Sequence, residues 1–352
     1  MSTPLTINSV ETLQEALPLI RASQEAYGTF TQEQVDAICE KTAMAVSKMR
    51  IPLAKMACEE TGYGIVVDKV TKNQYASEHV WNYMRNKKTC GVISEDKAYG
   101  VKKIASPKGV IAAITPTTNP TSTTIYKIML ALKTRNAIIL SPHPHAVNCS
   151  IAAAKIMRDA AIEAGLPEHV ISWISVPSLE ISDVLMKSVD LIMATGGSGM
   201  VKAAYSSGTP AIGVGPGNCN VVIDETADLR MAVESIIHSK TFDNGMICAS
   251  EQHITVLASV YDEVKRLLKE ARCYFLNDEE AAKVADVFFN AKTHGVKPDA
   301  VGQTACRLAE MAGIEVPYDT KVLIHETDDT SHDCPWANEK LTTLLGMYKA
   351  ET

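Results

Sequence analysis

The sequence predicts an α/β fold, with a doubly wound parallel sheet followed by a second, smaller α/β domain. Three observations lead to this prediction. From Gly109 onward the chain shows short, continuous apolar runs, which are typical of strands buried on both faces. Segments of helical length separate these runs and give repeated β-α-β units. A further α/β pattern begins near residue 252 and indicates the second domain.

Length and composition set the class of protein. The chain has 352 residues, which corresponds to about two domains of ordinary size. Hydrophobic residues make up 46% of it and charged residues 21%, which excludes a disordered chain and a coiled coil. The net charge is −7 and no block of Lys or Arg occurs, so we expect neither nucleic acid nor a membrane as a partner.

Targeting signals and a cysteine framework are not recognisable in the sequence. No stretch approaches the roughly 18 apolar residues that a membrane-spanning helix needs, and the first residues lack the pattern of a signal peptide. We therefore expect a cytoplasmic protein. The nine cysteines form no Cys-x-x-Cys pair, which argues against disulfides and zinc. We expect most of them to be buried and one to be chemical.

The first hundred residues predict a helical layer. Thr31 and Gln34 fit a capping box, and Val35 and Ile38 follow at helical spacing. Further helical patterns cover residues 52–60 and 67–86.

The central part of the chain predicts the parallel sheet. Its apolar runs cover residues 109–115, 136–141, 170–174, 191–195 and 210–214. The crossover helices are expected at residues 125–133, 146–164 and 179–187. A strand at 220–224, a helix at 227–240, a strand at 252–257 and a helix at 260–271 follow. In such sheets ligands bind beyond the carboxyl ends of the strands, so the loops there are candidate sites.

Two of these loops are polar and contain prolines. Asn119, before Pro120, puts an amide donor at the end of the first strand, although an Asn there could equally be a helix cap or a turn residue. The loop from Ser141 to His145 holds two imidazoles between prolines and forms a rigid polar wall. It offers too few ligands for a metal.

Two further loops are rich in glycine. Gly196, Gly197, Ser198 and Gly199 follow a strand and begin a helix, where backbone N–H groups can receive a phosphate. Their spacing does not match the dinucleotide fingerprint. The segment 213–217 has three glycines in five positions, which suits either a ligand close to the backbone or a tight turn.

Cys248 is the candidate nucleophile among the cysteines. It follows a Gly-containing loop and lies near an expected helix start, where a thiol pKa can be lowered. The alternative is a buried structural cysteine. Cys334 lies beside His332 and Asp333, but adjacent residues cannot all face one metal ion, so we expect no metal site.

Taken together, these segments resemble the aldehyde dehydrogenase superfamily. The resemblance is to the CoA-acylating branch and, most closely, to the N-terminal half of the bifunctional aldehyde-alcohol dehydrogenases. Its clearest segments are residues 200–208 and 247–252. It also runs through residues 30–36, 51–56, 88–92, 116–123, 132–138, 141–144 and 241–245.

The resemblance implies a role for each loop. Cys248 corresponds to the nucleophile that forms a thiohemiacetal and then an acyl thioester, while hydride passes to NAD. Asn119 corresponds to the side chain that, with the Cys248 backbone N–H, holds the oxyanion. The residues that the resemblance assigns to the cofactor are Thr117, Thr118, Ser141, His143, Gly196, Gly197, Ser198, Gly199, Gly213, Gly215 and Glu339.

One departure points to coenzyme A as the acyl acceptor. Hydrolytic relatives carry a glutamate in a Glu-Leu-Gly-Gly segment, where this chain reads Gly213-Val-Gly-Pro-Gly217. Without a base to activate water, the thioester lasts until a thiol attacks it. The resemblance therefore implies that a short aldehyde, acetaldehyde in the first place, reacts with CoA and NAD+ to give acyl-CoA and NADH.

The domain organisation follows the same resemblance. We expect the helical layer and the NAD-binding domain in residues 1–243, with an oligomerisation hairpin near 95–108, and a catalytic domain in 244–352 that is incomplete at its C-terminus. We expect a homo-oligomer, as in the family. In the Glu339 segment, Asn338 and Thr343 stand where the family has His and Pro. Two alternatives remain: a non-catalytic nucleotide-binding or assembly fragment, and an acylating enzyme for a sulfonated or carboxylated aldehyde such as sulfoacetaldehyde.

Overall fold

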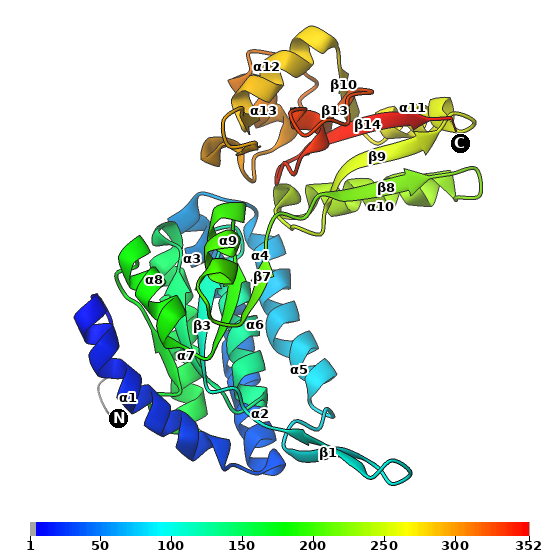
Figure 1. Ribbon diagram of the computed structural model, residues 1–352. Helices are drawn as coiled ribbons and strands as arrows, with labels where there is room; N and C mark the ends of the chain where they lie inside the picture. The colour runs from blue at the N-terminus through cyan, green and yellow to red at the C-terminus, as the bar shows by residue number, and fades with distance from the viewer. Residues whose placement is uncertain (1–4, 352) are drawn as a thin grey trace. The chain divides into compact units, whose positions relative to one another are not determined.

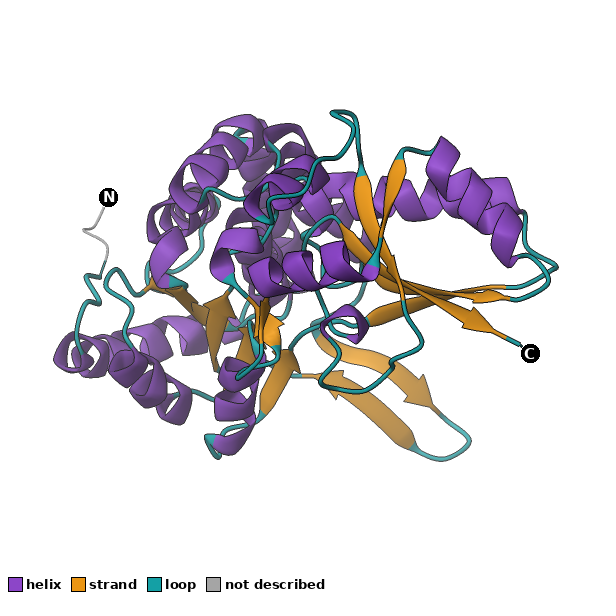
Figure 2. Ribbon diagram, turned by 90° about the horizontal axis from the view of Figure 1, so that it is seen from above, coloured by secondary structure: helices purple, strands orange, loops and turns teal. Residues whose placement is uncertain are grey.

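The computed structural model describes residues 5–351, which form two compact units. The first comprises the described residues up to Gly62 together with Val66–Gly215, and the second comprises Tyr63–Ile65 and the residues from Pro216 onward. Each unit contains a parallel sheet of five strands, which confirms the predicted α/β fold class (Figure 2). The predicted boundary after residue 243 falls inside the second unit.

The sheet of the first unit has the strand order β5-β4-β3-β6-β7. The chain passes from β3 to β4 and β5 on one side, and then returns to β6 on the other side of β3. The crevice beyond the carboxyl end of β3 is therefore the topological switch point, where such sheets bind ligands. The strands are β3 (Val110–Thr115), β4 (Ala137–Pro142), β5 (Ile171–Trp173), β6 (Leu191–Thr195) and β7 (Ala211–Val214).

Helices cover both faces of this sheet (Figure 1). The helices α6 and α7 pack on one face, α1 and α8 pack on the other, and α9 packs on β6 and β7. Every residue of β3 and β4 is buried, which explains why both strands are continuous apolar runs. The helices are α1 (Val10–Gly28), α6 (Pro120–Lys133), α7 (Val147–Glu163), α8 (Leu179–Ser188) and α9 (Ser198–Ser206), with a 3-10 turn at Pro144–Ala146.

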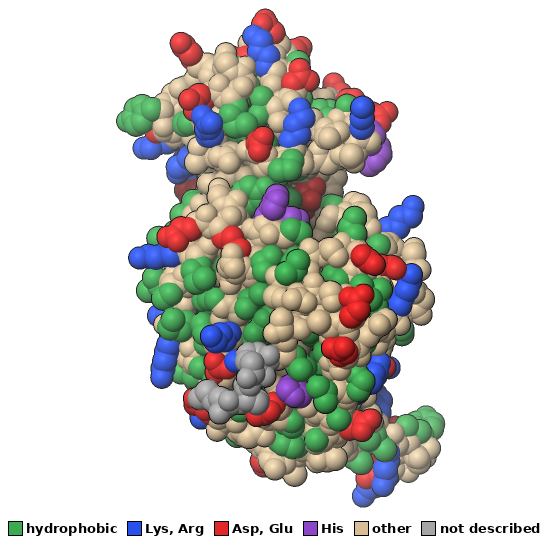
Figure 3. All heavy atoms as spheres, turned by 90° about the vertical axis from the view of Figure 1, so that its left-hand side faces the viewer, with side chains coloured by type: hydrophobic (Ala, Val, Ile, Leu, Met, Phe, Trp, Pro, Cys, Tyr) green, Lys and Arg blue, Asp and Glu red, His purple; other side chains and the backbone are tan. Residues whose placement is uncertain are grey.

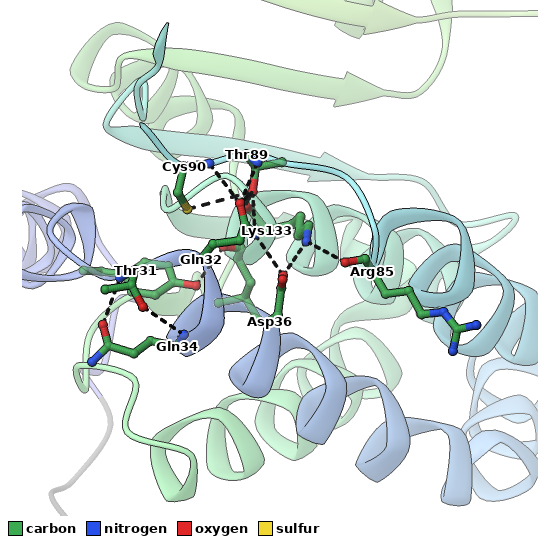
Figure 4. Close-up of polar contacts among 10 residues, drawn as sticks. Thr31, Gln32, Gln34, Asp36, Arg85, Thr89, Cys90 and Lys133 are labelled. Atoms are coloured by element: carbon green, nitrogen blue, oxygen red, sulfur yellow. Dashed lines mark hydrogen bonds and ion pairs between the residues drawn. The ribbon is translucent and has the colours of Figure 1, made fainter. Parts of the chain in front are cut away.

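The predicted helical layer is present and packs on α6 and α7. The capping box of Thr31 and Gln34 starts its helix α2. Lys133 of α6 is buried and pairs with Asp36, while the Gln32 side chain accepts the N–H of Thr89, so α2 is bonded to α6 and to the segment before the hairpin (Figure 4). The layer contains α2 (Gln32–Lys48), α3 (Arg50–Thr61), α4 (Val66–Gln74), a π-helical turn (Tyr75–His79) and α5 (Val80–Met84).

An antiparallel hairpin of β1 (Gly91–Asp96) and β2 (Val101–Ala105) extends from the first unit (Figure 1). Every residue of β1 is exposed, as are most of β2. A hairpin therefore exists close to the predicted position, and its role in oligomerisation stays a prediction.

The sheet of the second unit has the order β10-β13-β14-β9-β8. The helices α10 and α11 share one core with it, and α12 and α13 share another. Neighbouring residues of one strand enter different cores, as Leu323 and Ile324 do, because side chains alternate across a strand. The strands are β8 (Cys219–Ile223), β9 (Glu251–Leu257), β10 (Cys273–Leu276), β13 (Val322–Glu326) and β14 (Leu344–Ala350), with a small hairpin of β11 (Phe289–Asn290) and β12 (Gly295–Val296).

Of the helices of this unit, α10 and α11 begin and end close to the positions predicted from the sequence, whereas no positions were predicted for α12 and α13. The helices are α10 (Leu229–Thr241), α11 (Tyr261–Glu270), α12 (Asp278–Phe288) and α13 (Ala305–Met311), with 3-10 turns at Phe242–Gly245, Pro298–Ala300 and Pro335–Ala337. Among residues 5–351 no helix combines the length and the hydropathy needed to cross a membrane. On the face shown in Figure 3, acidic and basic side chains are interspersed, so this face of the described chain carries no continuous basic surface.

Candidate functional site

The first unit has a cavity of about 270 Å³ at the carboxyl edge of its sheet. The loops after β3, β4 and β6 line it. Four of the predicted cofactor residues meet there, namely Ser141, His143, Gly196 and Gly197. The other predicted residues of this unit, Thr117, Thr118, Ser198, Gly199, Gly213 and Gly215, are not among the residues that line it.

Thr115, at the end of β3, lines this cavity and has a buried, unsatisfied hydroxyl. Thr115 is 2% exposed, and its Oγ1 has no hydrogen-bond partner among the described residues. A buried hydroxyl without a partner is unfavourable by about 1–3 kcal/mol. A ligand with a polar group at this point would supply the partner. The sequence analysis missed Thr115, although its place at the end of an apolar run marked it.

The loop after β4 presents a neutral imidazole. Burial lowers the pKa of His143 below its ordinary value, and the neighbouring His145 lowers it further. The Nδ1 atom of His143 accepts the backbone N–H of His145 at 3.2 Å, which leaves the proton on Nε2. Ser141 is buried, and its hydroxyl lies 3.4 Å from that of Ser182. Both residues can therefore donate to a bound molecule.

The loop after β6 opens α9. Gly197 occupies the N-cap position, and no side chain caps the helix. The N–H groups of the first turn, together with the helix dipole, form a favourable place for an anion. Gly213 on β7 serves a different purpose, because a Cβ atom there would lie 2.8 Å from Tyr205 and from Val201 of α9. Close packing of α9 on β7 thus requires this glycine, and its part in cofactor binding stays a prediction.

Asn119 lies at the N-cap of α6, but its side chain does not cap the helix. Its Oδ1 instead accepts a hydrogen bond of 2.6 Å from Lys72 Nζ, and its Nδ2 donates to Thr118 Oγ1 at 3.3 Å. The alternative of a helix-capping asparagine is therefore wrong. Lys69 Nζ also donates to Thr118 O, at 2.9 Å. Neither lysine was identified from the sequence.

A buried lysine holds β3 and β6 together below the cavity. Lys127 Nζ donates to Ile114 O at 2.6 Å and to Met193 O at 2.8 Å. Burial lowers its pKa to about 7. The two carbonyls belong to β6 and β3, the strands on either side of the switch point. Lys127 therefore holds these two strands together near the sheet edge that the cavity adjoins.

Cys248, in the second unit, is exposed. Five other cysteines are buried, and burial raises the pKa of Cys39 and of Cys273 to about 12. The alternative that Cys248 is a buried structural cysteine is therefore wrong. The expected helix start beside it is also wrong, because the chain turns after Cys248 and continues directly into β9. A helix dipole thus does not act on this thiol.

The backbone around Cys248 is tightly constrained. A Cβ atom at Gly217 would overlap the Cys248 carbonyl, so only glycine allows the two segments to come this close. Cys219 Sγ lies 3.5 Å from the same carbonyl oxygen and donates to it. Upstream, Asp243 and Asn244 both have positive φ values, of 49° and 53°, which non-glycine residues adopt at a cost of about 1–3 kcal/mol each. Strain of this kind is typical of functional loops.

Glu339 is close to the Cys248 loop within this unit. Its Oε1 accepts the N–H of Gly217 at 2.8 Å. Burial raises the pKa of Glu339 to about 7, while the Gly217 N–H, Lys240 and Lys340 act in the opposite direction. The structure thus brings together Glu339, Gly217 and Cys248, of which Glu339 and Cys248 were predicted site residues.

Two fully buried lysines support this arrangement. Gln252 Oε1 accepts from Lys240 Nζ at 3.1 Å and from the Lys340 N–H at 2.9 Å, and Gln252 Nε2 donates to Ser250 O. Lys340 Nζ donates to Gln252 O and to Asn338 O. Burial lowers the pKa of Lys240 to about 7 and that of Lys340 well below its ordinary value. Gln252 therefore connects α10, the Cys248 loop and the Glu339 loop.

Among residues 5–351 no group of three or more His, Cys, Asp or Glu side chains could hold a metal ion.

Comparison with known proteins identifies close relatives. The model of the aldehyde dehydrogenase family matches residues 6–284. A bifunctional aldehyde-alcohol dehydrogenase of Escherichia coli K12 is 51% identical over 99% of this chain and 39% of its own length, and an aldehyde-alcohol dehydrogenase of Clostridium acetobutylicum is 50% identical over 98% and 40%. The chain thus spans about two fifths of these relatives. The crystal structure of an acetylating aldehyde dehydrogenase from Geobacillus thermoglucosidasius superimposes with a TM-score of 0.92 at 45% identity, covering 97% of this chain and 75% of that one.

Proposed function

This chain belongs to the aldehyde dehydrogenase family, and from that premise we propose that it is an acylating aldehyde dehydrogenase, which interconverts an aldehyde, CoA and NAD+ with acyl-CoA and NADH. The observation that carries the proposal is the exposed Cys248 on a loop held against Gly217, in a chain whose segment 213–217 has no carboxylate to activate water. The names of the relatives support the acylating reaction.

The chain's own residues account for the covalent steps. The Cys248 thiolate attacks the aldehyde carbonyl carbon and forms a thiohemiacetal. The resemblance to the family assigns the stabilisation of the negative charge on the former carbonyl oxygen to the Asn119 Nδ2 and the Cys248 N–H, and one such donor contributes about 2.7–4 kcal/mol. Once hydride has left, Cys248 carries the acyl group as a thioester. The CoA thiol then displaces the cysteine, which gives acyl-CoA and the regenerated enzyme.

The residues of the first unit fit a nicotinamide dinucleotide. Thr115, whose buried hydroxyl is unsatisfied, lines a cavity at the switch point together with Gly197, the N-cap of a helix that no side chain caps. Ser141 and His143 would hold the adenosine end and Gly196, Gly197, Ser198 and Gly199 the phosphates, with Thr117, Thr118, Gly213 and Gly215 near the cofactor. Glu339, in the second unit, is the residue that the resemblance to the family assigns to the nicotinamide ribose. When bound, the cofactor supplies the hydride acceptor.

The proposed activity has a direct test. The chain is mixed with acetaldehyde, CoA and NAD+, and NADH is followed by its absorbance, with Cys248→Ala as the control. We expect NADH only when CoA is present, and none from the variant. Release of free acid without CoA would overturn the acylating reaction. NADH binding without any turnover would instead favour the non-catalytic fragment.

Acetaldehyde is the substrate that we propose, since the solved relative is named an acetylating enzyme. A panel of acetaldehyde, propionaldehyde, succinate semialdehyde and sulfoacetaldehyde tests this choice. The highest kcat/KM should belong to acetaldehyde. A higher value for an anionic aldehyde would replace it with the sulfonated or carboxylated class.

A further inference from the structure

One face of α4 is polar and is turned toward the loop after β3. Lys69, Lys72 and Asn73 have the i, i+3, i+4 spacing that places side chains on one side of a helix. Lys69 is 2% exposed and Asn73 is 1% exposed. Buried polar groups are nearly always hydrogen-bonded. The hydrogen-bond partners of these side chains therefore indicate which part of the chain this face of α4 supports.

All three side chains bond to the Asn119 loop or to the start of α6. Lys69 Nζ donates to Thr118 O at 2.9 Å, and Lys72 Nζ donates to Asn119 Oδ1 at 2.6 Å. Asn73 Oδ1 accepts the hydroxyl of Thr121 at 2.8 Å. The α4 face thus binds the loop at three nearby positions, and the central bond is made to the side chain of Asn119 itself.

The bond from Lys72 determines how the Asn119 amide is oriented. The two ends of a carboxamide have almost the same shape, so packing alone does not distinguish them. An ammonium group can only donate, and therefore the atom that faces Lys72 must be the carbonyl oxygen. The donor Nδ2 is then the end of the amide that does not face Lys72, and one of its two protons goes to Thr118 Oγ1 at 3.3 Å. Because the donor is charged, this bond is stronger than one between neutral groups.

The same bond explains why the Asn119 side chain is not a helix cap. An N-cap asparagine normally accepts an N–H of the first helical turn, which uses the oxygen and folds the side chain back. Here Lys72 takes the oxygen, and the side chain makes no capping bond. The helix thus lacks a capping bond that would stabilise it by about 1 kcal/mol. The loss of this bond indicates that the Asn119 amide has another role.

We propose that Lys72 is a positioning residue, which holds the Asn119 amide so that its Nδ2 serves as the oxyanion donor. The inference rests on the proposed function, because Asn119 is an oxyanion donor only if the chain catalyses the aldehyde reaction. Lys72 acts through Asn119, while Lys69 bonds the backbone carbonyl of Thr118 before it and Asn73 bonds the hydroxyl of Thr121 after it.

The kinetic test uses Lys72→Met, which keeps the length of the side chain but removes the donor. We expect kcat to fall about tenfold with little change in KM, which is less than the roughly 100- to 1000-fold loss that removal of a donor causes. Lys72→Arg retains a charged donor and should recover most of the activity. Lys55→Met, at an exposed position on the neighbouring α3, is the matched control and should leave kcat unchanged.

A double-mutant cycle separates positioning from a general structural role. If Lys72 acts through Asn119, adding Lys72→Met to Asn119→Ala should cause little further loss of kcat. Full multiplication of the two losses would overturn the proposal, and so would a change confined to KM. Thermal unfolding of each variant shows whether it is folded. If Lys72→Met does not fold, the same cycle is measured with Lys72→Arg.

A spectroscopic test does not depend on turnover. The full chain is labelled with ¹⁵N-asparagine, and the side-chain amide signals of Asn119 are assigned by their absence in Asn119→Ala. We expect Lys72→Met, but not Lys55→Met, to shift these signals. Unshifted signals would overturn the positioning role even in an active enzyme. Shifted signals in a chain without turnover would retain the positioning contact while the proposed function failed.

Discussion

The hydroxyl of Thr115 is buried at the wall of the cavity and has no hydrogen-bond partner among the described residues. Thr115→Val replaces it with a methyl group of the same shape. We expect the melting temperature to stay unchanged or to rise, because an unsatisfied hydroxyl is removed. NADH affinity should fall about fivefold, which corresponds to roughly 1 kcal/mol for one hydrogen bond. A fluorescence titration with NADH measures the change.

Thr124→Val is the matched control for this prediction. Thr124 is fully buried on α6, its Oγ1 also lacks a partner among the described residues, and it does not line the cavity. Equal losses of NADH affinity in both variants would show that the Thr115 hydroxyl has no special contact with the cofactor.

Glu339 gives the second unit a carboxyl group that titrates near neutral pH. Because burial raises its folded-state pKa to about 7, its contribution to stability is fully present below about pH 4.5 and is lost as the pH rises through about 7. Between about pH 5 and about pH 8, the wild type should therefore lose stability relative to Glu339→Gln, by on the order of 1–3 kcal/mol. Urea unfolding at both pH values measures this, and Glu315→Gln at an exposed position should show no such trend.

The identity of the chemical residues could be inferred from the sequence, whereas their supports could not. Cys248 and Asn119 stand in loops whose composition and order are distinctive. Lys69, Lys240 and Lys340 look like solvent-facing lysines in any local pattern, because their burial results from segments far away in the chain. The i, i+3, i+4 spacing on α4 was a visible signal, but a polar stripe normally marks an exposed face.

The start of β9 depends on Gln252, whose side chain connects three segments of the second unit. Gln252→Leu would leave Lys240 Nζ and the Lys340 N–H without their acceptor inside the protein. We expect a loss of about 2–4 kcal/mol in the free energy of unfolding. Gln252→Glu retains the acceptor and should lose less.

Urea unfolding measures both variants, with Gln14→Leu at an exposed position on α1 as the control. If Gln252→Leu is no less stable than this control, the connecting role of Gln252 is wrong.

At the scale of whole elements, the buried strands were predictable and the turn at Cys248 was not. The runs that became β3 and β4 are apolar throughout because helices cover both of their faces. Cys248 was expected to follow a Gly-containing loop and to lie near a helix start. The actual course of the loop depends on the close approach of Gly217 and on the positive φ values at Asp243 and Asn244, which no local pattern indicates.

For the whole molecule, the hairpin of β1 and β2 is the feature that suggests self-association. Ile104 on β2 is 64% exposed and Val92, its partner on β1, is 39% exposed, and exposed apolar side chains on adjacent strands are typical of interfaces. If the chain forms a homo-oligomer through this hairpin, Ile104→Asp should lower its mass in solution. Light scattering measures the mass, with Lys103→Glu on the same strand as the control. An unchanged mass would exclude the hairpin from the interface.

The position of β14 in the second sheet has a consequence for how the protein is made. This strand is the most C-terminal one described, yet it lies between β13 and β9, in the middle of the strand order. While the ribosome is still synthesising the preceding loop, the β8-β9 pair and the β10-β13 pair have no strand to join them. The facing edges of β9 and β13 therefore stay unpaired until β14 has left the exit tunnel. Because unpaired strand edges favour aggregation, we expect the nascent second unit to be most prone to aggregation in this interval.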